Sequence, residues 1–331
     1  MTHSTTIRRS SRRALPALVV AALLLALCAA AGSSSASSGM RAGGDPTVDK
    51  LAQVLARGTI VLSTDPAYPP QSWQVKGAKR LAGTKCAENQ MTANQMTGYD
   101  VDTGKLVAKG LGVEACFVAP TWTEITAGQW GDRWDLAYGS GAINGDRMQR
   151  LWMTTPYRSE PQRYFVQKKS PYKKPADLDG KEIGVCDSCT VEFYLRGALK
   201  IPNIRLKVDV KKPKVAVYAE EVPGLRDLDR GKIDAYLTAE AVGMEGIHQG
   251  EKLRPLPGAA FTMYLTGFLD KSSALSQAAF AAKVDQIIGK AQRSGALKAL
   301  SLKYFGKDYA TNAADYDVAK LHQKIPSAAG G

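Results

Sequence analysis

The 331-residue sequence is poor in histidine, with only His3, His248 and His322, and these lie far apart. This spacing argues against a Ser-His or Cys-His nucleophile and against a histidine-based metal site, because both need imidazoles beside their partners. The Gly-x-x-x-x-Gly-Lys-Ser/Thr motif that holds ATP phosphates does not occur. We therefore expect a protein without catalysis, metal or cofactor.

Acidic residues are fewer than basic ones, 31 against 44, which gives a formal net charge of +13. Part of the excess comes from residues 1–31, which contain arginines but no Asp or Glu. A positive chain attracts anionic solutes and surfaces over long distances. The Lys and Arg residues are scattered, however, and no basic stripe alternates with aromatic residues, which argues against nucleic-acid binding.

The N-terminus has the order of a secretion signal. A basic head is followed by an apolar run over residues 14–31 and by a Gly/Ser/Ala spacer over residues 32–39. The run Ala29–Ala31 offers a cleavage site for free secretion, whereas Cys28 would instead carry a lipid anchor. Both outcomes stay open. We expect residues 1–46 to be a signal peptide and flexible leader, and the protein to be exported to the periplasm or the outer face of the cytoplasmic membrane.

Cysteine is also scarce, with only four residues beyond Cys28: Cys86, Cys116, Cys186 and Cys189. An even number in an exported protein suggests disulfides. The last two cysteines suit a local bridge, which leaves the first two for a long-range one, although the sequence allows three pairings. The Cys-x-x-Cys spacing also fits a thioredoxin-like redox pair at a helix N-terminus. We favour a structural disulfide there.

Short β-branched or apolar runs alternate with amphipathic stretches through most of the chain. Strands are expected at residues 59–63, 113–118, 135–138, 162–167, 182–185, 233–237 and 261–269. This alternation predicts an α/β fold with a mainly parallel sheet. The polar residues 74–97 are predicted to form an inserted loop, and the residues after about 311 a peripheral tail.

One segment carries the pattern of an anion site. The small residues Gly139–Ala142 follow a predicted strand, and Arg147 comes soon after. Small residues allow a ligand close to backbone N–H groups, and a guanidinium can hold a carboxylate through two parallel hydrogen bonds. The alternative is a surface turn with a solvated arginine. The pattern predicts the anion-holding half of a small-molecule cleft.

Six segments occur in an order that resembles one known family. They are Asp65–Pro70, Gly98–Asp102, Arg147 with the Pro156-Tyr157 pair nine residues later, Asp177–Val185, Gly231–Ala235 and Lys303–Gly306. With them, residues 50–308 resemble the bacterial extracellular solute-binding proteins of the amino-acid type, family 3. The resemblance implies a monomer that captures an amino acid or related small carboxylate for an ABC importer, whose permease and ATPase are other proteins.

The resemblance also implies a fold. Family members have the two-lobed type II periplasmic-binding-protein fold, in which two hinge strands join two α/β lobes around a ligand cleft. Closure of the lobes around the hinge traps the ligand. The hinge strands would fall near residues 160–167 and 259–266. Lobe 1 would then comprise residues 47–159 and 259–311, lobe 2 residues 160–258, and the C-terminal tail residues 312–331.

Matching positions give the implied ligand contacts. Arg147 would hold the ligand α-carboxylate, Ser140 would supply a hydroxyl contact, and Tyr68 and Trp122 would supply aromatic walls. Thr190 begins a predicted helix, where its hydroxyl and free N–H groups can meet an anion. The structural alternatives are a turn anchor for Tyr68, core packing for Trp122 and a plain N-cap for Thr190.

Two positions depart from the family pattern. Asn144 stands three residues before the arginine, where a threonine is common. Ala239 stands where an acidic residue usually pairs with the ligand ammonium, and Glu240 is next to it. Either Glu240 takes that role after a small shift, or the ligand lacks a conventional α-ammonium.

The best enzymatic alternative is a periplasmic cyclohexadienyl-dehydratase-like enzyme, which shares this fold. Such an enzyme needs a carboxylate general acid in its cleft. Glu240 and Glu192 are the two candidates that the sequence offers.

Overall fold

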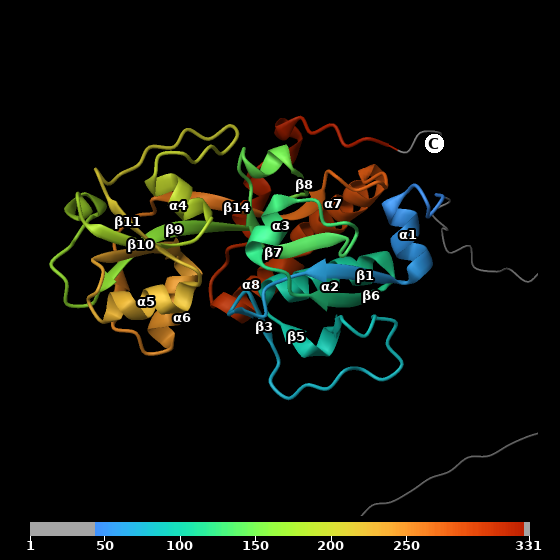
Figure 1. Ribbon diagram of the computed structural model, residues 1–331, viewed down its shortest axis with the longest axis horizontal. Coiled ribbons are helices and arrows are strands. Elements are labelled where there is room, and N and C mark those ends of the chain that lie inside the picture. The colour runs from blue at the N-terminus through green and yellow to red at the C-terminus, as the bar shows by residue number, and fades with distance from the viewer. Residues whose placement is uncertain (1–43, 328–331) are drawn as a thin grey trace, which may run out of the picture. The chain divides into compact units, whose positions relative to one another are not determined.

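The computed structural model describes residues 44–327 (Figure 1). Nearly all of the predicted leader, including Cys28, lies outside these residues. The described residues include no helix that is both long and apolar enough to span a bilayer. The predicted α/β fold is confirmed, because within residues 44–327 eleven strands form one sheet, with helices packed against it, and three short strands form a second sheet. The prediction of a mainly parallel sheet is wrong, because the central strands of the large sheet pair antiparallel.

The first group of parallel strands forms one end of the large sheet. Strand β1 lies between β6 and β7 and is buried along its whole length, as its continuous apolar run predicts. Helix α2 packs against these strands and against α7 and α8, and α1 packs against α7. The elements are α1 (Lys50–Arg57), β1 (Thr59–Ser63), α2 (Tyr99–Leu111), β6 (Glu114–Val118), α3 (Trp122–Ala127), β7 (Leu136–Ala142), α7 (Ala278–Arg293) and α8 (Ala296–Phe305).

The second group forms the other end of the sheet. Strand β10 pairs in parallel with β11 and β12, and in Figure 1 helices α5 and α6 lie together on the side away from α4. The helix expected at residues 190–199 is shorter, since the chain leaves it before Gly197, which has a left-handed backbone. The elements are β10 (Glu182–Cys186), α4 (Thr190–Leu195), β11 (Lys214–Tyr218), α5 (Glu221–Asp229), β12 (Ala235–Ala239) and α6 (Glu240–His248).

Two long strands join these groups. In β9 (Arg158–Gln167), residues 162–165 pair with β12, and residues 158–162 pair with the other long strand, β14 (Phe261–Asp270). Strand β14 then pairs with β7 of the first group. Short strands β13 (Leu253–Pro255) and β8 (Leu151–Met153) extend the pairing of β9 and β14 respectively. The chain therefore passes from one group to the other through adjacent antiparallel strands.

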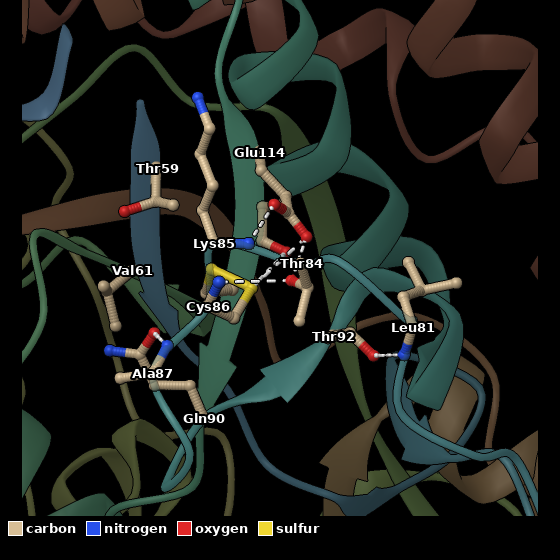
Figure 2. The surroundings of a disulfide bond; sticks show 12 residues. Thr59, Val61, Leu81, Thr84, Lys85, Cys86, Ala87, Gln90, Thr92 and Glu114 are labelled. Atoms are coloured by element: carbon tan, nitrogen blue, oxygen red, sulfur yellow. Dashed lines mark hydrogen bonds between the residues drawn. A yellow bond between two sulfur atoms is a disulfide. The ribbon is translucent and has the colours of Figure 1, made fainter. Parts of the chain in front are cut away.

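The predicted insertion is tied to the first group by a disulfide. Cys86 bonds to Cys116 of β6, and the nearby Glu114 carboxylate accepts hydrogen bonds from Thr84 and the Lys85 N–H (Figure 2). The second disulfide joins Cys186 to Cys189. The favoured pairing is confirmed. Around the insertion, β2 (Ala67–Tyr68), β3 (Ser72–Gln74) and β5 (Met96–Thr97) form the small sheet, and β4 (Met91–Thr92) pairs with β6.

The C-terminal segment packs more closely than the sequence predicts. Tyr316 stacks on Tyr264 of β14 and donates a hydrogen bond of 3.1 Å to the Pro202 carbonyl, in the loop after α4. Gln323 exchanges hydrogen bonds of 2.7 and 2.9 Å with the Met153 backbone of β8. This segment therefore contacts residues near both groups of strands.

Candidate functional site

A cavity of about 400 Å³ lies where strands of both groups end. Its walls come from segments at or just after the carboxyl ends of β1, β7, β10, β11 and β12, the usual place for ligands in α/β sheets. The volume is in the range of small-molecule pockets. Among the residues predicted from sequence, those that line the cavity are Tyr68, Trp122, Ser140, Arg147 and Thr190, whereas Ala142 and Glu240 do not.

Arg147 is buried and held from three sides. It begins the short 3-10 helix η2 (Arg147–Gln149), and its backbone N–H donates to the Asn144 side-chain oxygen at 2.8 Å. Its Nη1 donates to the Ala142 carbonyl at 3.0 Å and to the Thr190 hydroxyl at 3.3 Å. The guanidinium carbon lies 4.8 Å from the centre of the Trp122 ring, in cation–π contact. Ala142 therefore positions the arginine, although it does not line the cavity.

The charge of this arginine has no protein counterion in the described part of the chain. No carboxylate there lies within ion-pair distance of Arg147, and burial lowers the pKa of its guanidinium to about 10. A buried cation without a partner is costly, so an anion that enters the cavity gains a charge-assisted hydrogen-bonding partner. The site can therefore hold a carboxylate.

Ser140 lines the cavity, and its hydroxyl is also bonded within the protein. Its hydroxyl donates to Asp100 at 2.6 Å and accepts from Arg158 at 2.8 Å, so both bonds stay within the protein. The Asp100 carboxylate also accepts from the Tyr157 hydroxyl at 3.0 Å, and burial raises its pKa against the opposing effect of Arg158. These bonds fix the end of β7 beside β9.

Tyr68 reaches from the small sheet to the second group of strands. It lies on β2 and packs against a core cluster that includes Phe165, Leu225 and Tyr236. Burial raises the pKa of its phenol well above the usual value, and the Glu221 carboxylate raises it further. Tyr68, an aromatic wall of the cavity, therefore also contacts the second group of strands.

The disulfide Cys186–Cys189 contributes both of its cysteines to the cavity wall. Thr190 follows directly as the first residue of α4. Because the Thr190 hydroxyl accepts from Arg147, this short loop connects β10 to the buried arginine.

Glu240 is buried at the start of α6 but faces away from the cavity. Its Oε1 lies 3.3 Å from the Arg163 guanidinium and 3.1 Å from the Lys307 ammonium. The neighbouring Ala239 does line the cavity. The position where the family pattern has an acid therefore presents a methyl group to the cavity, and the adjacent acid is engaged elsewhere.

Glu221 is a cavity residue that the sequence reasoning missed. It is the first residue of α5, and its Oε2 is buried beside the Tyr236 and Thr238 hydroxyls. Burial raises the pKa of this carboxyl to about 7. A signal was available, because the pair Glu220-Glu221 follows, after one intervening residue, a strand that pairs in parallel with its neighbour, where ligand contacts collect.

Residues 60–307 match the bacterial extracellular solute-binding proteins, family 3. The L-cystine-binding protein TcyJ of Escherichia coli is 27% identical over 260 residues, which cover 78% of this chain and 86% of that protein. Cyclohexadienyl dehydratase of Pseudomonas aeruginosa is 23% identical over 75% of this chain and 83% of its own length. The crystal structures of ArtJ, an arginine-, lysine-, histidine-binding protein from Geobacillus stearothermophilus, share the fold, with a TM-score of 0.61 and 23% identity over 78% of this chain and 100% of that one. The chain belongs to the bacterial extracellular solute-binding proteins of family 3.

Proposed function

We propose that the protein is the exported binding component of an ABC importer, and that it captures an amino acid or related small carboxylate in the cavity. The observation that carries this proposal is the buried Arg147, which faces the cavity and has no counterion among residues 44–327. Trp122 and Thr190 hold the guanidinium in place before a ligand arrives. Such preorganisation lowers the entropic cost of binding.

In the same proposal, two lobes of the protein close about two hinge strands. Residues 47–159 with 259–311 form lobe 1, and residues 160–258 form lobe 2, with β9 and β14 as the hinge strands. A ligand that contacts both walls of the cavity favours the closed arrangement over the open one. The closed protein, as a monomer, then delivers the ligand to a membrane permease that works with a separate ATPase.

Thermal denaturation of the mature protein with each of the twenty standard L-amino acids and L-cystine tests the proposal. A ligand present at 100 times its dissociation constant stabilises the folded state by about 2.7 kcal/mol. Arg147→Ala should remove the stabilisation, whereas Arg150→Ala should keep it, because Arg150 is exposed and pairs with Asp146 away from the cavity. If no compound stabilises the wild type, or if Arg147→Ala binds equally well, the proposal fails.

The dehydratase remains the second candidate function, since one curated relative has that activity. The two carboxylates that the sequence offers as general acids are both engaged outside the cavity lining: Glu240 with Lys307, and Glu192 with Arg196 at 2.9 Å. Incubation of the protein with prephenate distinguishes the functions. Product formation would favour the enzyme, and binding of an amino acid without turnover favours the importer component.

A further inference from the structure

The two sides of the cavity differ in charge. Arg147 and Asp65 line the cavity on the side of the first group of strands, whereas five carboxylates and Arg226 line it on the side of the second group, where carboxylates therefore predominate. The acids from that side are Asp187, Glu220, Glu221, Glu245 and Glu251. A ligand that spans the cavity therefore meets a cation at one end and carboxylates at the other.

Two of these carboxylates have partners of their own. Glu251 lies 3.8 Å from Arg226, and Glu245 accepts from Gln249 at 2.6 Å. Asp187 and Glu220 are exposed to solvent. Their charges are therefore paired or hydrated in the absence of a ligand.

Glu221 differs because its buried Oε2 lies beside groups that carry no positive charge. The Tyr236 and Thr238 hydroxyls hydrogen-bond to this carboxyl and act to lower its pKa. Within residues 44–327, no Lys or Arg lies within ion-pair distance of Glu221. A buried carboxylate without a cationic partner is costly, so a cation on a ligand would stabilise it.

The sheet places Glu221 at the same edge as the position where the family pattern has its acid. Strand β10 lies between β11 and β12 and is parallel to both, so the ends of β11 and β12 reach the same edge. Glu221 follows the end of β11, and Ala239 is the last residue of β12. A carboxylate at the first position can approach the same cavity as a carboxylate at the second.

We propose that Glu221 binds a protonated amine of the ligand, in place of an acid at residue 239, while Arg147 binds the ligand carboxylate. The ligand is then an amino acid with a free ammonium group, and an amine-free carboxylate is excluded. This inference rests on the proposed function and adds the second charged contact to it. Glu221 is a specificity-determining residue in this view.

The proposal carries a defined pH dependence. Burial raises the pKa of Glu221 to about 7, the Tyr236 and Thr238 hydroxyls act in the opposite direction, and the Glu160 charge raises it further. Tyr68 and Tyr236 are the other titratable groups that face it. A bound ammonium favours the ionised carboxylate, so binding releases a proton at low pH. Affinity should rise with pH, by at most tenfold per unit below about 7, and level off near pH 8.

Glu221→Gln tests this assignment by calorimetric titration between pH 6 and pH 8. The probe is whichever of the twenty standard L-amino acids or L-cystine stabilises the wild type most in the thermal screen. The variant should bind it about thirtyfold more weakly or worse at pH 8, because loss of one partner of a buried charge pair costs 2 kcal/mol or more. Its affinity should also be nearly independent of pH.

Asp227→Asn is the matched control. Asp227 lies on the same helix α5 but pairs with Lys232 at 3.0 Å and does not line the cavity. The control removes the same charge from the same helix and should keep both the affinity and its pH dependence.

Wild-type behaviour of Glu221→Gln at every pH would overturn the inference, and so would equally tight binding of the amine-free dicarboxylate glutarate. In either case, continued dependence of binding on Arg147 would leave the proposed function standing. If binding depends on neither residue, both proposals fail together.

Discussion

Lys307 and Glu240 form an ion pair between lobe 1 and lobe 2 as proposed above, with Nζ 3.1 Å from Oε1. Lys307 follows α8, and Glu240 begins α6. Arg163 of hinge strand β9 approaches the same carboxylate oxygen at 3.3 Å. The Glu240 carboxylate is therefore paired with two cations of the protein.

Glu240→Gln should have little effect on ligand affinity. Lys307 is largely exposed, and such ion pairs contribute about 1 kcal/mol or less, which corresponds to about fivefold in a dissociation constant. Calorimetric titration at pH 8 measures the change. A loss as large as that expected for Glu221→Gln would make Glu240 the partner of the ammonium after all.

Arg147→Met should abolish binding without lowering the stability of the ligand-free protein. The native arginine is a buried charge without a counterion in the described part of the chain, so an apolar side chain of similar length removes an unfavourable contribution. Urea denaturation should give a free energy of unfolding equal to or above that of the wild type. A clear loss of stability would show that the Ala142 and Thr190 bonds outweigh the cost of burying the charge.

Ser140→Ala should destabilise the fold. The hydroxyl serves both Asp100 and Arg158, and its removal leaves two buried groups each short of one hydrogen bond. Leaving a buried polar group unsatisfied costs about 1–3 kcal/mol, so the free energy of unfolding should fall by at least that amount. Urea denaturation measures it. A variant of full stability but reduced ligand affinity would instead support the hydroxyl contact implied by the family resemblance.

Loss of one disulfide should mainly lower stability, and loss of the other should mainly weaken ligand binding. The Cys86–Cys116 bridge closes a loop with a sequence separation of 30, and its replacement by two alanines should lower the free energy of unfolding by roughly 3–4 kcal/mol. The Cys186–Cys189 bridge spans only 3 positions, so its loss should cost roughly 2 kcal/mol. Because it lines the cavity beside Thr190, its loss should mainly weaken ligand binding. Paired denaturation and binding measurements on the two double variants test this contrast.

The sequence was informative for features that depend on the spacing of residues along the chain. The segments around Asp65, Arg147 and Thr190 each follow a strand, and parallel strands bring such positions to one edge. The disulfide pairing could also be proposed, because a Cys-x-x-Cys pair is close in any local conformation. These features depend on spacing along the chain.

The charge arrangement of the cavity could not be predicted in the same way. Whether Glu221 or Glu240 faces the cavity depends on the orientation of α5 and α6 against the sheet. The two acids look alike in sequence, since each begins a helix directly after a strand or a short turn. The two carboxylates differ in their burial and in their bonding partners. Both of these properties depend on tertiary packing.

The C-terminal segment bears on the lobe movement proposed above. Two adjacent connecting strands, β9 and β14, would permit the proposed lobes to rotate about an axis between the strands and also to twist against each other. Tyr316 at Pro202 and Gln323 at Met153 fasten a third stretch of chain away from that axis. A rotation that separates Pro202 from Met153 must stretch or detach this segment, so its attachment limits the angle to which the cleft can open and reduces twisting. In the proposed movement, residues remote from the cavity would therefore help to set the resting aperture of the cleft and the rate at which ligands enter.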